Sequence, residues 1–152
     1  MIKVLFVCHG NICRSPMAEF ILKDMIAKRH LSSDFSVASA ATSTEEIGNA
    51  VYPPARKILS THGISCEGKT ARQVRRADYE AYDHLIVMDD WNVRNLMRII
   101  GSDPEGKVSR LLDFTDHPGQ IDDPWYTRDF DGVYRQIEEG CRAFLKSLGY
   151  EE

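Results

Sequence analysis

The stretch MIKVLFVCHGNICRSP, residues 1–16, decides the fold and carries most of the chemistry. Residues 1–7 are rich in β-branched and aromatic side chains and alternate little, which is typical of a strand buried on both faces of a parallel sheet. Ser15 is a good N-cap residue and Pro16 a good first helical residue, so the pattern predicts that a helix begins there. Residues 8–14 therefore form a loop between a buried strand and a helix N-terminus.

This loop has the ingredients of an anion-binding site. Where such a loop leads into a helix, unpaired backbone N–H groups and the positive end of the helix dipole face the same point. Asn11 and Gly10 both tolerate the left-handed backbone that inward-facing amides require. We expect the loop to bind a phosphate group through His9, Gly10, Asn11, Ile12, Cys13, Arg14 and Ser15.

A cysteine opens the loop and an arginine closes it, at the spacing Cys-x5-Arg. A thiol beneath amide donors and beside a guanidinium ionises readily, because each neighbour stabilises the thiolate more than the thiol. Cys8 is therefore the candidate nucleophile. Arg14 offers a planar fork that binds two phosphoryl oxygens at once, in the bound substrate and in the transition state.

Phosphoryl transfer to Cys8 also needs a carboxyl group that protonates the leaving oxygen and later activates water, and one residue can perform both steps in turn. Asp123 is the candidate, because Pro124 restricts it to extended conformations on a stiff loop. Its neighbour Asp122 is the rival, and the residues alone leave this choice open.

Length and composition limit the remaining possibilities. The chain fits one domain, residues 1–152, with a single core. It has no apolar run of about 18 residues and no signal-peptide pattern, so we expect a cytoplasmic protein without a membrane partner. The four cysteines lack the Cys-x2-Cys spacing of zinc sites, and the net charge of −4 argues against a nucleic-acid partner.

Apolar runs alternate with helical patterns along the rest of the chain. Strands are predicted over residues 35–40, 84–88 and 108–114, and helices over 16–28, 53–61, 91–100 and 130–148. Residues 115–128 are predicted to form a long loop, and Asp78 to cap a short helical turn. The alternation implies an α/β three-layer sandwich, a parallel sheet with helices on both faces. Ligands bind beyond the carboxyl ends of such strands, where Cys8, Ser39, Asp89 and the loop with Asp123 fall.

The chain resembles the low-molecular-weight protein tyrosine phosphatase family over nearly its whole length. The matching segments are residues 8–16 and 123–124, then 39–42, 63–64, 71–73, 88–89 with Asn92, and 141–145. Their order and spacing together make the resemblance specific. It implies a four-stranded sheet in the order 2-1-3-4. It also implies hydrolysis of phosphotyrosine and aryl phosphate monoesters through a phosphocysteine at Cys8, with no metal and no cofactor.

The resemblance also implies a phosphotyrosine-containing protein or peptide as substrate and inorganic phosphate as product, and we expect a monomer. It assigns the acid to the Asp directly before Pro, Asp123, and leaves Asp122 to loop structure. Asn11 is expected to hold the loop through a side-chain network with Ser39, and Ser15 to place its hydroxyl near the thiolate. The alternatives are that Ser15 is only an N-cap and Ser39 only a strand-end residue.

Ile12, Trp125 and Tyr126 are predicted to form walls around an aromatic ring. Relatives that act on phosphoarginine carry threonine where Ile12 stands, so Ile12 favours phosphotyrosine. The chain departs from the animal enzymes near Glu45, where they carry an aromatic residue, and near residues 68–70, where they carry a histidine. One wall and one member of the network are therefore missing or replaced.

Cys13 has two interpretations. A reversible disulfide with Cys8 would protect a redox-sensitive nucleophile, or Cys13 packs as a small apolar residue behind the loop.

Two other functions compete with the phosphatase. An arsenate reductase on the same loop needs extra cysteines just beyond the third strand, and residues 75–97 contain none. A phosphate-binding or redox-sensing module without turnover does not need the full set of Cys8, Arg14 and Asp123. The leading prediction is therefore a cysteine-dependent protein tyrosine phosphatase.

Overall fold

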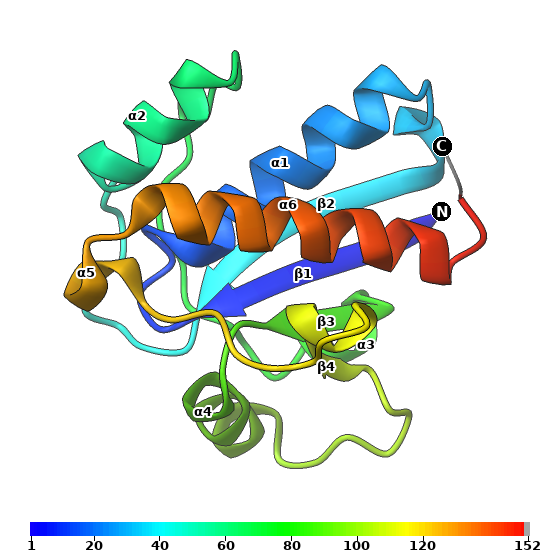
Figure 1. Ribbon diagram of the computed structural model, residues 1–152. Coiled ribbons are helices and arrows are strands. Elements are labelled where there is room, and N and C mark those ends of the chain that lie inside the picture. Colours follow the sequence, from blue (N-terminus) through cyan, green and yellow to red (C-terminus); the bar gives the residue numbers. More distant parts are fainter. Residues whose placement is uncertain (151–152) are drawn as a thin grey trace.

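β1 (Ile2–Cys8) lies at the centre of the sheet and carries Cys8 at its carboxyl end. In the computed structural model, which describes residues 1–150, it pairs in parallel with β2 (Phe35–Ala41) on one side and β3 (His84–Val87) on the other. β4 (Val108–Arg110) extends the sheet beyond β3, so the strand order is β2-β1-β3-β4 (Figure 1). The predicted parallel α/β sheet and its order are confirmed.

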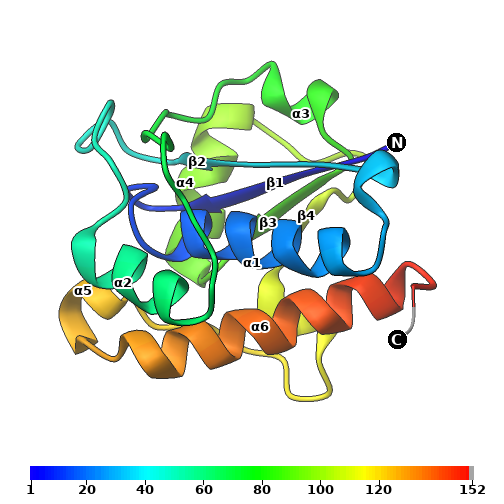
Figure 2. The ribbon, with the colours of Figure 1, turned by 90° about the horizontal axis from the view of Figure 1, so that it is seen from above.

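Helices cover both faces of this sheet (Figure 2). One face packs against α1 (Arg14–Lys28), α2 (Pro53–Thr61) and α6 (Phe130–Ser147), and the other against α3 (Asp78–Ala81) and α4 (Asp90–Ile100). Within β1, Val4 and Phe6 face the first layer, whereas Leu5 and Val7 face the second, and all four are fully buried. Burial of such a side chain contributes about 1.5–3 kcal/mol. No helix within residues 1–150 has the length and apolarity needed to cross a bilayer.

The fourth strand is shorter than predicted. It ends at Arg110, and a 3-10 helix, η2 (Leu111–Phe114), takes up the rest of the apolar run. Leu111 and Leu112 are both buried in the core that contains α6, whereas successive residues of a strand point to opposite faces. The predicted loop over residues 115–128 contains a short helix, α5 (Pro124–Thr127), and a 3-10 turn, η1 (Ser32–Asp34), precedes β2.

Two predicted helix starts are also wrong. α1 begins at Arg14, so Ser15 is not its N-cap, and Pro16 is the third helical residue rather than the first. The missing N–H of Pro16 still costs nothing, because amides of the first turn have no helical partner. α3 begins at Asp78 with Ala77 in the cap position, and the Asp78 carboxylate binds Arg72 instead.

Gly140 of α6 packs closely against Leu111 of η2. A Cβ atom at this position would lie 2.5 Å from Cγ of Leu111. Alanine in place of a helical glycine gains about 1 kcal/mol, whereas overpacking costs about 1–3 kcal/mol. We expect Gly140→Ala to lower the free energy of unfolding in urea by about 1 kcal/mol. Combining it with Leu111→Ala should give less than the sum of the two single losses, and an unchanged or higher stability of Gly140→Ala would contradict the expectation.

Candidate active site

The loop after β1 turns its carbonyl groups away from its centre. The carbonyl of His9 accepts a hydrogen bond from the amide of Ser43 at 3.0 Å, and that of Ile12 accepts one from the amide of Tyr52 at 2.9 Å. In each planar peptide unit the N–H points opposite to the carbonyl. The amides that follow His9 and Ile12 therefore face the inside of the loop, where an anion can accept their hydrogen bonds.

Asn11 holds the loop in this shape. Its φ of 58° lies in the left-handed region, and its side chain is buried. Its Nδ2 donates to Oγ of Ser15 at 2.8 Å and to Oγ of Ser39 at 2.9 Å, while its Oδ1 accepts from the amide of Arg72 at 3.2 Å. Asn11 adopts the left-handed backbone that it tolerates, whereas Gly10 does not have a positive φ.

Cys8 is buried at the base of the loop, and Ser15 approaches its sulfur twice. The Ser15 hydroxyl oxygen lies 3.0 Å from Sγ of Cys8, and the Ser15 amide donates to the same sulfur at 3.4 Å. Because Asn11 already donates to the Ser15 oxygen, the hydroxyl hydrogen is available to a Cys8 thiolate. The alternative acceptor, the carbonyl of Ala40, is farther away at 3.5 Å. Ser15 thus faces the sulfur rather than capping the helix.

Arg14 is held in place by two acceptors from distant parts of the chain. Its Nη1 donates to Oδ2 of Asp89 at 2.6 Å and to the carbonyl of Ile121 at 2.8 Å. Burial alone would lower the pKa of Arg14, but the charges of Cys8, Asp89 and Asp123 raise it overall, so the guanidinium stays positive. The sequence placed Asp89 at a strand end without a role. Asp89 both orients Arg14 and caps α4 by accepting from the amide of Asn92 at 2.7 Å.

Asp123 reaches the pocket and Asp122 does not. One Asp123 carboxylate oxygen, Oδ1, accepts from the amide of Trp125 at 3.0 Å and so caps α5, while the other, Oδ2, lies 3.6 Å from Nη2 of Arg14. Asp122 is exposed and lines a separate depression with Thr127. The geometry therefore brings Asp123, the candidate that the resemblance favoured, to the same place as Arg14.

These groups line one pocket of about 140 Å³. Cys8, Arg14 and Asp123 all contribute to it, and the three predicted wall residues Ile12, Trp125 and Tyr126 line it as well. Trp125 and Tyr126 remain 44% and 80% exposed, so their rings are free to contact a substrate.

The pocket also has acidic lining residues near the position where the animal enzymes carry an aromatic residue. Glu45 and Glu46 line it, and Oε2 of Glu45 lies 2.8 Å from Nε2 of His9. The side chain of His9 therefore lies at the rim with Glu45. Only its backbone belongs to the phosphate-binding loop.

The network behind the loop ends in a cluster of charges around the buried Glu19 that was not predicted. Ser39 donates to Oε1 of Glu19 at 2.6 Å, and the other Glu19 oxygen binds Nζ of Lys23 at 2.6 Å. Nζ of Lys69 donates to the Ser39 carbonyl at 2.9 Å and lies 3.4 Å from Glu19, although burial lowers the pKa of this lysine. Lys69 therefore stands in the network near the position where the animal enzymes carry a histidine.

Cys13 is buried beside the nucleophile. It lines the same pocket as Cys8, and both thiols are free. Burial, together with the nearby charges of Cys8 and Asp123, raises the pKa of the Cys13 thiol. Cys13 is thus a neutral thiol at physiological pH. This is compatible with both interpretations of Cys13, packing behind the loop and a disulfide with Cys8.

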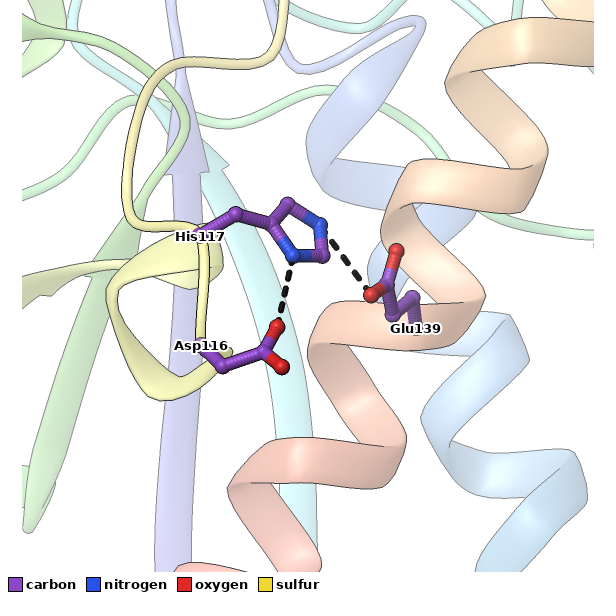
Figure 3. Close-up of side chains that lie close together, drawn as sticks. All are labelled: Asp116, His117 and Glu139. Carbon is purple, nitrogen blue, oxygen red and sulfur yellow. Dashed lines mark hydrogen bonds and ion pairs between the residues drawn. The ribbon is translucent and has the colours of Figure 1, made fainter.

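A second cluster of ionisable side chains lies away from this pocket (Figure 3). Nδ1 of His117 is 2.8 Å from Asp116, and its Nε2 is 3.1 Å from Glu139 of α6. These three side chains could in principle hold a metal ion. The two carboxylates, however, face different nitrogens of one ring, so a single ion cannot bind both carboxylates and the ring as they stand. The arrangement fits an imidazolium held between two carboxylates.

The hydrogen bond that His117 donates to Asp116, together with the charge of Glu139, raises the pKa of His117 above its usual 6.5. A raised pKa means that the interaction stabilises the fold below about pH 6.5 and is lost as the pH rises through the folded-state value. We expect an NMR titration to place the pKa of His117 above 6.5. We also expect His117→Gln to lower the melting temperature at pH 6 but not at pH 9. An equal effect at both pH values would contradict this.

Comparison with known proteins matches the whole length of the chain to one family. A sequence profile described as "Low molecular weight phosphotyrosine protein phosphatase" matches residues 3–152. The chain is 40% identical to low molecular weight protein-tyrosine-phosphatase YfkJ of Bacillus subtilis, over 100% of this chain and 99% of the relative. It is 39% identical to the human low molecular weight phosphotyrosine protein phosphatase, over 94% and 93% of the two chains. The chain belongs to the low molecular weight protein tyrosine phosphatase family.

Solved structures extend the similarity to three dimensions. The crystal structure of YfkJ from Bacillus subtilis superposes with a TM-score of 0.94 over 98% of this chain and 95% of the other. A Drosophila arginine phosphatase superposes with a TM-score of 0.88 at 31% identity, over 99% of this chain and all of the other. Proteins named for two kinds of phosphorylated residue therefore share this fold.

Proposed function

We propose that the chain hydrolyses phosphotyrosine and other aryl phosphate monoesters through a phosphocysteine at Cys8. The observation that carries this proposal is the convergence of three groups in one pocket: the Cys8 sulfur, the Arg14 guanidinium and the Asp123 carboxyl group. They come from the two ends of the loop after β1 and from the segment before α5. Together they supply a nucleophile, an electrostatic clamp and an acid.

In the first step the Cys8 thiolate attacks phosphorus, and an S–P bond forms as the P–O bond to the phenol breaks. Inward-facing loop amides and Arg14 bind the non-bridging oxygens, whose charge is spread in the transition state. Asp123 gives its proton to the leaving phenolate oxygen.

In the second step Asp123, now ionised, takes a proton from a water molecule that attacks the phosphocysteine. The S–P bond breaks, inorganic phosphate leaves and the thiolate returns. The Ser15 hydroxyl and amide stabilise the leaving sulfur, because both lie within hydrogen-bond reach of it.

Phosphotyrosine is the substrate that the walls favour. Ile12, Trp125 and Tyr126 give an aromatic ring an apolar surface beside the phosphate seat. Phosphoarginine is the alternative, since one structural neighbour is named an arginine phosphatase. Peptides that differ only in the phosphorylated residue distinguish the two, and faster hydrolysis of the phosphoarginine peptide would overturn the substrate assignment.

Mass spectrometry of a trapped enzyme tests the mechanism. Asp123→Ala removes the group that activates water, so the phosphorylated form should accumulate when an aryl phosphate with an acidic phenol is mixed in. We expect a mass increase of one phosphoryl group on the peptide that contains Cys8. A phosphoryl group on another residue would overturn the phosphocysteine mechanism. So would the absence of a phosphorylated form in both the Asp123→Ala protein and the unmodified protein.

Three further properties belong to the proposal. One chain supplies every group named above, which supports action as a monomer. The free thiols of Cys8, Cys13, Cys66 and Cys141 support a cytoplasmic location, where disulfides are rare.

Peroxide would oxidise Cys8 to a sulfenic acid, which the Cys13 thiol attacks to give a disulfide and water. Inactivation that dithiothreitol reverses, but not in Cys13→Ser, would support this redox sensitivity.

A further inference from the structure

Tyr52 joins the nucleophile loop to the segment that carries the acid. Its amide donates to the carbonyl of Ile12 at 2.9 Å, so its backbone is part of the support of the phosphate-binding loop. Its ring centre lies 4.7 Å from that of Trp125 and 6.1 Å from that of Phe130. Tyr52 directly precedes α2, and both views place α5 beside that end of α2 (Figures 1 and 2).

Arg128, just after α5, contacts the same two aromatic rings, Tyr52 and Phe130. Its Nη1 donates to the Tyr52 hydroxyl oxygen at 3.0 Å, and its guanidinium carbon lies 5.5 Å from the ring centres of both Tyr52 and Phe130. A guanidinium over aromatic faces at this distance is a stabilising cation–π contact. Arg128 also ends α5, with its amide bonded to the Pro124 carbonyl at 2.9 Å and a left-handed φ of 62°.

α5 therefore is fixed at both ends. Asp123 caps its start and Arg128 ends it, and the helix is only four residues long, Pro124–Thr127. A helix this short has little stability of its own, so contacts outside it decide where it lies. Movement of Arg128 away from Tyr52 would move the Asp123 carboxyl group relative to Cys8 and Arg14.

We propose that the contact between Tyr52 and Arg128, the Tyr52–Arg128 clamp, sets the position of the general acid Asp123 over the nucleophile loop. Tyr52 and Arg128 are positioning residues, because they act through Asp123 and not on the reacting atoms. The inference rests on the proposed acid role of Asp123. The Asp89 and Ile121 contacts that orient Arg14 involve neither Tyr52 nor Arg128, so loss of the clamp leaves the support of Arg14 in place.

The test compares two small aryl phosphates that differ in their leaving group. A phenolate that is more basic needs the acid more, so misplacing Asp123 slows phenyl phosphate more than p-nitrophenyl phosphate. Arg128→Asn removes the guanidinium but keeps a residue that tolerates the left-handed backbone. We expect kcat/KM to fall about 5-fold for phenyl phosphate, which is about 1 kcal/mol, and less than about 2-fold for p-nitrophenyl phosphate.

Arg128→Asn in an Asp123→Asn protein tests whether Arg128 affects the rate through Asp123. Without an acid to position, Arg128→Asn should change neither rate further. Tyr52→Phe, which keeps the ring and loses only the hydroxyl, should show the same leaving-group pattern more weakly, and it serves if Arg128→Asn does not fold. Arg135→Gln removes another exposed arginine, which lines a separate depression, and should change nothing.

Equal losses with both substrates, no loss at all, or a loss that persists without Asp123 would overturn the clamp while leaving the phosphatase mechanism intact. If Asp123→Asn itself slows the two substrates equally, Asp123 is not the acid, and the mechanism fails together with the clamp. The small substrates exclude an effect of Arg128 on peptide binding, because they have no flanking residues.

Discussion

Replacing Cys8 with serine is expected to abolish turnover of aryl phosphates, with a loss of roughly 10⁴-fold or more in kcat. A serine hydroxyl in the same position stays protonated at neutral pH, so the strong nucleophile is gone. The surrounding donors remain: Arg14 stays bound to Asp89 and Ile121, and Asn11 still holds the loop. Binding of inorganic phosphate, measured by titration calorimetry, should therefore change little while the rate collapses.

A second buried thiol provides the control that separates loss of the nucleophile from a general effect of replacing cysteine with serine. Cys66 is also buried but lines a different depression, and burial rather than any catalytic partner raises its pKa. Cys66→Ser should keep the activity of the unmodified enzyme. Activity of Cys8→Ser within about 100-fold of the unmodified protein would require another nucleophile and would overturn the mechanism.

The strand, loop and helix at the start of the chain could be predicted because their signals are local. A buried apolar run, a glycine and an asparagine, and a cluster of cap-forming residues follow one another within 16 residues. The same signals misplaced the helix start, because serine is favoured both as an N-cap and as a hydroxyl donor. Only the three-dimensional position of Ser15, 3.0 Å from Cys8, separates the two roles.

The groups that the sequence did not assign depend on contacts between distant segments. Asp89 is 75 positions from Arg14, and Arg128 is 76 positions from Tyr52. Glu19 lies in the buried first half of α1, and only the fold brings Ser39 to its carboxylate. The apolar run after Val108 was similarly ambiguous, since burial beneath α6, rather than its composition, turns it into a 3-10 helix.

Replacing Arg14 with lysine is expected to lower kcat/KM by roughly 10³-fold while the protein stays folded. The guanidinium uses one nitrogen, Nη1, for Asp89 and the Ile121 carbonyl and keeps its other edge toward the pocket, where Nη2 lies 3.6 Å from Asp123. A lysine ammonium keeps the charge but has three donors on one atom, so it cannot satisfy both supports and two phosphoryl oxygens.

Arg14→Lys should weaken binding of the transition state more than binding of the substrate. In that state phosphorus has five oxygen or sulfur neighbours, and the flat guanidinium fits two equatorial oxygens better than it fits the tetrahedral ground state. Vanadate adopts a similar five-coordinate geometry, so its affinity should fall in step with kcat/KM, whereas the affinity for inorganic phosphate falls less. Arg110→Lys, at an arginine that pairs with Asp90 and Asp113 on the surface, serves as the control and should change neither affinity. Equal losses in vanadate and phosphate affinity would mean that Arg14 only docks the substrate.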